Sequence, residues 1–123
     1  MGTRFRSGFE AAFARDLYDR RIKASYEPDK IRFVPNPRTY TPDFYVEQEG
    51  FYVETKGLFS PEDRAKHLLV RKQHPDIDIR FIFMDSKKRL SKKSKTTYAQ
   101  WCDKHGFQYD VMRLPEGWIN DGR

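Results

Sequence analysis

The chain has 123 residues, of which 37% are hydrophobic and 34% charged, and 24 Lys and Arg against 18 Asp and Glu give a formal net charge of +6. That length suits one domain with a modest core, and the basic excess favours association with a polyanion such as nucleic acid. The single cysteine, Cys102, excludes an intrachain disulfide and a cysteine-based zinc site, and it predicts a cytoplasmic protein. No apolar run approaches the length of a membrane span, and residues 1–10 lack the apolar centre of a signal peptide.

The first part of the chain predicts a helix followed by short extended segments. In residues 7–21, Ser7 is a favourable N-cap, Glu10 stands at the capping-box position, and Phe13 and Leu17 share one face. Residues 22–26 and 31–34 are then typical of short strands.

Prolines and a hairpin dominate the middle of the chain. Pro35, Pro37 and Pro42 exclude a helix from this region and favour a stiff, extended connection. Residues 43–55 then predict two strands joined by a tight turn at residues 48–50.

The second half of the chain predicts two more helices and two more strands. Residues 60–74 form a helix that begins with Ser60 as N-cap, and residues 77–84 are the most apolar strand, which favours an interior place in a sheet. A basic loop follows, then a helix over residues 96–106 and a last strand over residues 107–112. Strands flanked by helices predict an α/β fold with a mixed central β-sheet, in a single domain over residues 1–123.

Two acids and a lysine stand together on the predicted hairpin. With this turn Asp43 opposes Glu54, so that the two side chains would lie roughly 5 Å apart. Lys56 shares the face of Glu54, whereas Thr55 points to the other face but offers its backbone carbonyl as an oxygen ligand. Two carboxylates, a carbonyl and water suit Mg²⁺, and a lysine beside them suits phosphodiester hydrolysis. The alternative is a solvated strand edge, because a Pro-Asp pair followed by Glu-x-Lys also arises by chance.

Five segments of the sequence carry a family resemblance. They are "FRSGFE", "YTPDF", "VETKG", "HLLVRKQHPDIDIR" and "CDKHG", which follow one another from about Phe5 to Trp118. In order and spacing they resemble the phage endonuclease I family of Holliday-junction-resolving enzymes, within the PD-(D/E)xK nuclease superfamily. The resemblance implies a nuclease-like fold in a homodimer that exchanges segments through an extended bridge, here residues 34–38. The alternative for that bridge is an ordinary surface loop.

The same resemblance implies a Mg²⁺-dependent, structure-selective endodeoxyribonuclease that resolves four-way and other branched DNA junctions by paired nicks, giving 5′-phosphate ends. It implies two Mg²⁺ per active site, with Mn²⁺ as a substitute. The catalytic residues would be Glu10, Asp43, Glu54 and Lys56, and the metal ligands Asp43, Glu54, Thr55 and Glu10. Glu10 would come from the opposite subunit, although the residues alone favour a helix cap for it. The family's further acid aligns near Ser25 and has no counterpart here.

Clustered basic residues predict where DNA binds, because neutralising phosphates favours association. The candidate DNA-binding residues are Arg4, Arg6, Arg64, Lys66, His67, Arg71, Lys87, Lys88, Arg89, Lys92 and Lys93. For any one of them a solvated surface position is the alternative. The predicted partners are branched DNA and a second copy of the chain, with no membrane and no small-molecule cofactor. A phage-encoded chain would act in the host cytoplasm. Two other hypotheses stay open: a non-catalytic branched-DNA-binding protein, and a sequence-specific restriction-type nuclease on the same fold.

Overall fold

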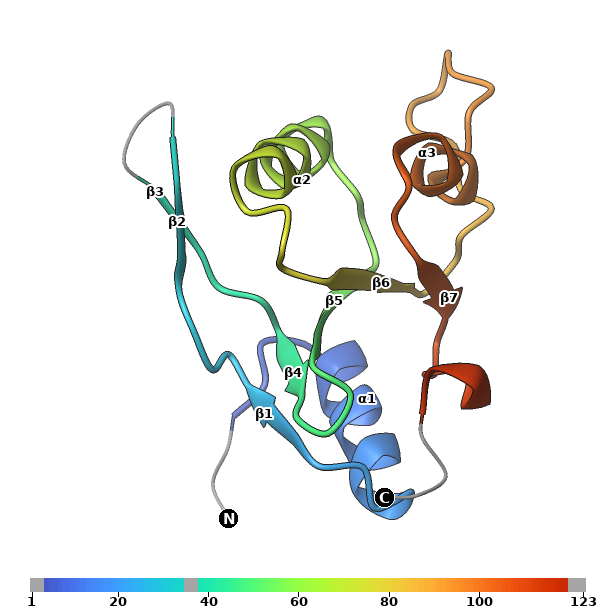
Figure 1. Ribbon diagram of the computed structural model, residues 1–123. Helices are drawn as coiled ribbons and strands as arrows, with labels where there is room; N and C mark the ends of the chain where they lie inside the picture. Colours follow the sequence, from blue (N-terminus) through green and yellow to red (C-terminus); the bar gives the residue numbers. More distant parts are fainter. Residues whose placement is uncertain (1–3, 35–37, 120–123) are drawn as a thin grey trace.

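The computed structural model describes residues 4–34 and 38–119, and its centre is a five-stranded sheet (Figure 1). The strands are β1 (Ala24–Tyr26), β4 (Phe44–Val46), β5 (Phe51–Lys56), β6 (Ile79–Phe83) and β7 (Tyr109–Val111), in the order β1-β4-β5-β6-β7. The pairs β1–β4 and β4–β5 are antiparallel, whereas β5–β6 and β6–β7 are parallel. The predicted α/β class with a mixed sheet is confirmed, and β6 is an interior strand as expected.

Helices cover both faces of this sheet. The helix α1 (Gly8–Asp19) buries Phe13 and Leu17 in a cluster with residues of β4, β5 and β6. On the opposite face lie α2 (Pro61–Gln73) and α3 (Tyr98–His105), which Figure 1 shows side by side above the sheet, with α1 below it. A short 3₁₀ turn, η1 (Glu116–Trp118), closes the described chain. The arrangement leaves β5 covered on both sides, which is why its one acidic residue, Glu54, is buried.

The helix ends follow the local signals in the sequence. Ser60 and Asp63 form a complete capping box at the start of α2, and Gly106 ends α3 in the left-handed conformation with φ of 76°. Ser7 caps α1 by accepting the N–H of Glu10. The return bond of a capping box is different here, because the Glu10 carboxylate accepts the N–H of Arg6. The Glu10 carboxylate therefore bonds the residue before the N-cap and not the N–H of Ser7 itself.

A second, two-stranded sheet lies beside the main one, where the sequence predicted extended segments without predicting their pairing. Strand β2 (Ile31–Phe33) pairs antiparallel with β3 (Arg38–Tyr40). The prolines that exclude a helix here flank β3 in the sequence and do not interrupt it, so its N–H groups remain able to pair. Most of the proposed bridge, residues 35–37, lies outside the described residues. At its near end the side-chain amide of Gln73 bonds both the N–H and the carbonyl of Val34.

The remaining general expectations concern Cys102 and membranes. Cys102 is fully buried in the aromatic cluster around α3, and burial raises the pKa of its thiol to about 12. Cys102 therefore has a packing role, because a protonated, enclosed thiol is a poor nucleophile. In residues 4–34 and 38–119, no helix has the length and apolar character needed to cross a bilayer.

Candidate active site

The hairpin of β4 and β5 has the predicted register, and it places Asp43 one residue before the paired region. Phe44 pairs with Val53 and Val46 with Phe51. Asp43 instead accepts two hydrogen bonds on Oδ2, from the backbone N–H of Thr55 at 2.9 Å and from its hydroxyl at 2.8 Å. The side chain of Thr55, which strand alternation places on the face opposite Glu54, is therefore a partner of Asp43, a contact that the sequence did not predict. Because Asp43 lies beyond the ladder, strand alternation does not keep it from reaching the neighbouring position.

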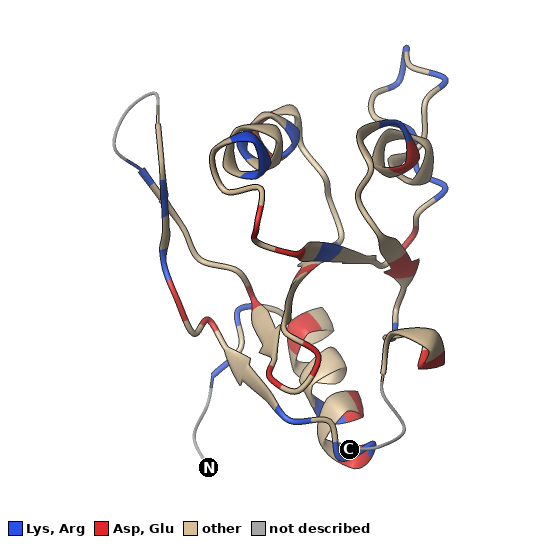
Figure 2. Ribbon diagram, in the orientation of Figure 1, with Lys and Arg blue, Asp and Glu red and all other residues tan. Residues whose placement is uncertain are grey.

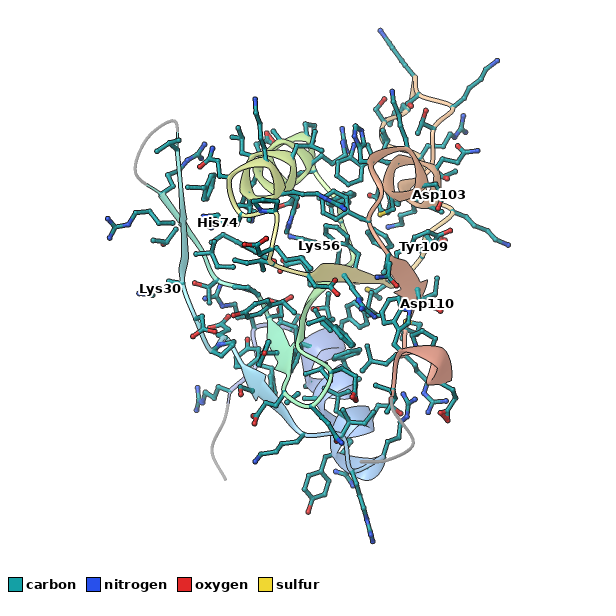
Figure 3. The ribbon with its side chains drawn as sticks, viewed as in Figure 1. Lys30, Lys56, His74, Asp103, Tyr109 and Asp110 are labelled. Atoms are coloured by element: carbon teal, nitrogen blue, oxygen red, sulfur yellow. The ribbon has the colours of Figure 1, made fainter. Side chains whose placement is uncertain are left out.

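Glu54 and Lys56 are held by a network that reaches into α2 and β3. The hydroxyl of Tyr40 donates to Glu54 Oε1 at 2.6 Å. The ammonium of Lys56 lies 3.4 Å from Glu54 Oε2 and 3.1 Å from Asp63 Oδ1. Asp63 is fixed in turn by the capping box of α2, so the helix start sets the position of the lysine. Figure 3 shows Lys56 near the centre of the molecule, below α2.

Glu10 approaches the same region from α1. Its Oε1 accepts the hydroxyl of Tyr26 at 2.6 Å and the N–H of Arg6 at 3.1 Å, and only 8% of the residue is exposed. A pocket of about 350 Å³ lies among these groups. Its lining residues are Arg6, Glu10, Thr39, Tyr40, Thr41, Asp43, Glu54, Thr55, Lys56 and Lys66. The structure thus brings together, within one chain, all four residues that the sequence predicted to be catalytic.

Burial dominates the electrostatics of this pocket. Burial and, after it, the nearby charge of Glu54 raise the pKa of Asp43 to about 7, although the two hydrogen bonds from Thr55 lower it. Burial also raises the pKa of Glu54, against the opposing effect of Lys56. For Lys56 burial lowers the pKa, but the charges of Glu54 and Asp63 outweigh it, and the net shift is upward. The side chain of Lys56 is accordingly protonated at neutral pH, whereas only part of the Asp43 carboxyl is ionised there.

Binding of a divalent cation in this pocket would depend on the oxygen atoms that its residues supply. Within the described ranges, no group of three or more His, Cys, Asp or Glu side chains is arranged so that it could hold a metal ion by itself. Asp43 and Glu54 nevertheless line one pocket as buried oxygen donors, and the charge of Glu54 raises the pKa of Asp43. The hard oxygens of carboxylates and water suit Mg²⁺. The residues fit a site of two carboxylates completed by backbone carbonyl and water.

One predicted DNA-binding residue is corrected by the structure. His67 is fully buried, with its ring 4.9 Å from that of Tyr40 and 4.7 Å from that of Phe81. Neither ring nitrogen has a hydrogen-bond partner among the described residues, and burial lowers the pKa of His67 well below its usual value. A neutral imidazole enclosed by aromatic rings does not contact DNA.

The other basic candidates fall into three groups. Lys66 and Arg6 line the pocket. Arg64 donates to the carbonyl of Phe59, and Arg71 donates to the carbonyl of Gly106, so these two also stabilise the fold. The exposed remainder are Arg4 and the loop residues Lys87, Lys88, Arg89, Lys92 and Lys93. Figure 2 shows that loop as a run of positive charge beyond α3.

Three polar residues of the site were missed from the sequence. In the sequence Asp63 is simply an acid in the first turn of a predicted helix, whereas in the structure it also forms an ion pair with Lys56. Tyr26 and Tyr40 donate to carboxylates that are 16 and 14 residues away in the chain. A tyrosine in a strand carries no local signal of such a partner, because the pairing depends on tertiary structure.

Comparison with known proteins agrees with this geometry. The family model described as "Phage endonuclease I" matches residues 1–123. The chain is 44% identical over 119 residues to "Endonuclease I" of Escherichia phage T7, which covers 95% of this chain and 79% of that protein. It is 41% identical over 123 residues to "Endodeoxyribonuclease 1" of Enterobacteria phage T3, covering 98% of this chain and 80% of that protein.

Proposed function

Because the chain belongs to the phage endonuclease I family, we propose that it is a DNA endonuclease that cuts branched DNA, four-way junctions included, by paired nicks. The single observation that carries this proposal is the pocket in which Glu10, Asp43, Glu54 and Lys56 meet. Buried acidic side chains beside a protonated lysine have little structural purpose, but they suit hydrolysis of a phosphodiester.

The proposed cofactor is Mg²⁺, with Mn²⁺ as a substitute. Asp43 and Glu54 would hold it with the carbonyl of Thr55, and Glu10 would contribute to a second ion. When bound, the cation polarises the phosphate and makes water a better nucleophile. No further small-molecule cofactor is proposed.

The residues of this chain divide the remaining work. Lys56 stays protonated because Glu54 and Asp63 flank it, so it stabilises the negative charge that builds on the phosphate and does not act as a base. Water attacks phosphorus in line and loses a proton to solvent, the bond from phosphorus to the 3′ oxygen breaks, and the 5′ phosphate remains on the product. The leaving oxygen takes its proton from solvent.

Selectivity for branched DNA would rest on backbone contacts and on a homodimer. The exposed cations of residues 87–93 and the pocket residues Arg6 and Lys66 offer phosphate contacts. Two pockets at a fixed spacing would cut two strands of a junction together. In the single chain Glu10 lines its own pocket. We also propose that the segments on either side of residues 35–37 are exchanged in the homodimer, so that Glu10 takes the same place in the partner's pocket.

The proposal is tested by one set of cleavage assays. Labelled four-way junction, linear duplex and single strand are each incubated with Mg²⁺ or with EDTA. We expect cleavage of the junction in Mg²⁺, with 5′-phosphate ends, and none in EDTA. Cuts at a fixed sequence in linear duplex would instead support a restriction-type nuclease, and binding without any cleavage would support a non-catalytic binding protein.

Two variants connect this activity to the pocket. Glu54→Ala and Lys56→Ala each remove one side chain that the assay should require, while the exposed cations remain. We expect junction binding close to that of the wild type and loss of cleavage by at least about 100-fold, in line with the loss of a charged group from a catalytic site. Cleavage at the wild-type rate by purified Glu54→Ala protein would remove the pocket from the mechanism.

A further inference from the structure

We propose that Tyr26 and Tyr40 are positioning residues, each of which fixes one carboxylate of the pocket in the orientation that binds a divalent cation. Tyr26 serves Glu10, and Tyr40 serves Glu54. This inference rests on the proposed metal-dependent cleavage and names the residues that prepare the pocket for it.

The hydrogen bond from Tyr40 is short, and the ring that makes it is buried and held by its neighbours. Its hydroxyl is 2.6 Å from Glu54 Oε1, which is the short distance typical of a donor to a carboxylate. Only 3% of Tyr40 is exposed, and its ring is fixed edge-on against the buried ring of His67 at 4.9 Å. The ring of Tyr40 also lies beneath the ammonium of Lys66, at 5.0 Å. The hydroxyl therefore has little freedom to leave Glu54.

The bond from Tyr26 repeats this arrangement on the other side of the pocket. Its hydroxyl is 2.6 Å from Glu10 Oε1 and accepts the N–H of Arg6 at 3.2 Å. The ring packs edge-on against Phe5 at 4.6 Å and at a tilt against Phe44 at 5.3 Å. Tyr26 lies on β1 and Tyr40 on β3, so two separate strands supply the same kind of donor.

Each bond is made to Oε1, so the tyrosine does not engage Oε2 of the same carboxylate. For Glu54, that second oxygen is the one that Lys56 approaches. A hydrogen bond to one oxygen of a ligating carboxylate fixes its rotamer, and loss of such a partner commonly weakens metal binding by about 10- to 100-fold. Without the hydroxyls, the two glutamates would still be present but would have to be ordered by the cation itself.

The two pairs are also independent of the proposed segment exchange. Tyr26 and Glu10 both precede residues 35–37, whereas Tyr40 and Glu54 both follow them. Each tyrosine therefore stays with its own carboxylate whether a pocket is built from one chain or from two. This gives each half of the site a carboxylate that is ordered before the halves meet.

The test compares Tyr26→Phe and Tyr40→Phe with the wild type. Phenylalanine keeps the ring and its packing, so that only the hydroxyl is lost. Binding of Mn²⁺ alone to the metal-free protein is measured by calorimetry, without DNA. We expect about 10-fold or greater weakening in each variant, and in cleavage assays a lower kcat with an unchanged KM for the junction.

A matched control is available in Tyr52→Phe. The hydroxyl of Tyr52 donates to Asp29 Oδ2 at 2.7 Å, which is the same kind of bond outside the pocket. This variant should bind Mn²⁺ and cleave junctions like the wild type. A loss of stability common to all three variants would then be separated from an effect on the cation.

The outcomes separate this inference from the proposed function. Wild-type Mn²⁺ affinity in both pocket variants overturns the inference, even where their cleavage is slower. If one variant fails to fold by circular dichroism, the other decides, because the two pairs lie in different segments. A wild-type protein that binds Mn²⁺ but cleaves nothing would refute the proposed nuclease, while the comparison of affinities would still decide the role of the tyrosines.

Discussion

Asp43 and Thr55 are joined twice through a single oxygen, since Oδ2 of Asp43 accepts both the N–H and the hydroxyl of Thr55. Both bonds lower the pKa of the carboxyl, yet burial and the charge of Glu54 prevail and raise it to about 7. A carboxylate that is held in place but incompletely charged at neutral pH is prepared for a cation and unfavourable without one. Its effect on stability can therefore be measured.

The first prediction is that Asp43 makes the metal-free protein less stable as pH rises. Its pKa is about 7 in the folded protein against 3.8 ordinarily, so between these values the folded state holds a proton that the unfolded state has lost. Stability from this group is present at low pH and is lost as pH rises to about 7, at about 1.4 kcal/mol per pKa unit. Asp43→Asn should lack this loss.

Denaturant unfolding in EDTA at pH 5 and pH 7.5 measures the effect as the difference between Asp43→Asn and the wild type. Taking that difference removes the contributions of other titrating groups. We expect the free energy of unfolding of the variant, relative to that of the wild type, to rise by a few kcal/mol between pH 5 and pH 7.5. Parallel pH profiles for the two proteins would show that the carboxyl is not buried beside a second charge.

The second prediction concerns His67 and has the opposite sign. Burial lowers its pKa well below 6.5, so in mild acid the unfolded chain binds a proton that the folded chain excludes. Stability from this group is present above pH 6.5 and is lost as pH falls below it. Between pH 7 and pH 5 the wild type should lose about 2 kcal/mol relative to His67→Phe, as measured by denaturant unfolding.

DNA binding provides the second measurement for the same variant. His67→Phe should bind junctions like the wild type, because the ring is enclosed by aromatic side chains. Lys66→Ala, at the neighbouring position in the pocket lining, should bind them more weakly. Weaker junction binding by His67→Phe at unchanged stability would restore the role that the sequence suggested.

His67 also shows where reasoning from the sequence fails and why. The helix, its N-cap and its proline at the first position were all predictable, because these signals act within a few residues. Which face is buried was not, since polarity argues for Leu68 inside and His67 outside, whereas Leu68 is 38% exposed and His67 is enclosed. The aromatic cluster that encloses the histidine is assembled from distant strands.

In the site, too, the features set by local sequence were predictable and those set by tertiary packing were not. The hairpin register follows from a turn of known length, and it brought Asp43, Glu54 and Lys56 together on the sequence alone. The contact between Asp43 and Thr55 did not follow, because Asp43 lies just beyond the ladder of β4 and β5 and alternation no longer fixes its direction. The donation from Tyr26 depends on how β1 lies against α1, and the contacts of Tyr40 and Asp63 depend on how β3 and α2 lie against β5, which no short pattern encodes.

The third prediction is that Asp63 orients Lys56. Its Oδ1 lies 3.1 Å from the lysine ammonium, while its Oδ2 accepts the N–H of Ser60 in the capping box. Asp63→Asn removes the charge that holds the ammonium, so we expect a kcat about 10-fold lower with an unchanged KM for the junction, in line with the loss of a positioning group.

Ser60→Ala separates this effect from a weaker helix. It removes the hydroxyl that accepts the N–H of Asp63 and should lower stability by about 1 kcal/mol, while the carboxylate and its contact with Lys56 remain. Its kcat should be close to that of the wild type. Equal losses of kcat in the two variants would mean that the helix start matters and the ion pair does not.

The fourth prediction tests segment exchange by mixing two inactive chains. Glu10 precedes residues 35–37, and Glu54 follows them. In an exchanged dimer of one Glu10→Ala chain and one Glu54→Ala chain, both substitutions fall in one pocket and the other pocket is intact. Without exchange, each pocket carries one substitution and neither works. Co-expressed chains with different tags should therefore regain nicking of junctions, but not paired cuts.

The control is a mixed dimer of Asp43→Ala and Glu54→Ala chains. Both positions follow residues 35–37, so with or without exchange every pocket of this dimer carries one substitution. It should remain inactive, which excludes recovery by contaminating wild-type protein. Recovery in the first mixture and none in the second can arise only if the acid of α1 crosses to the partner's hairpin, whereas an inactive first mixture would place all four residues of each pocket on one chain.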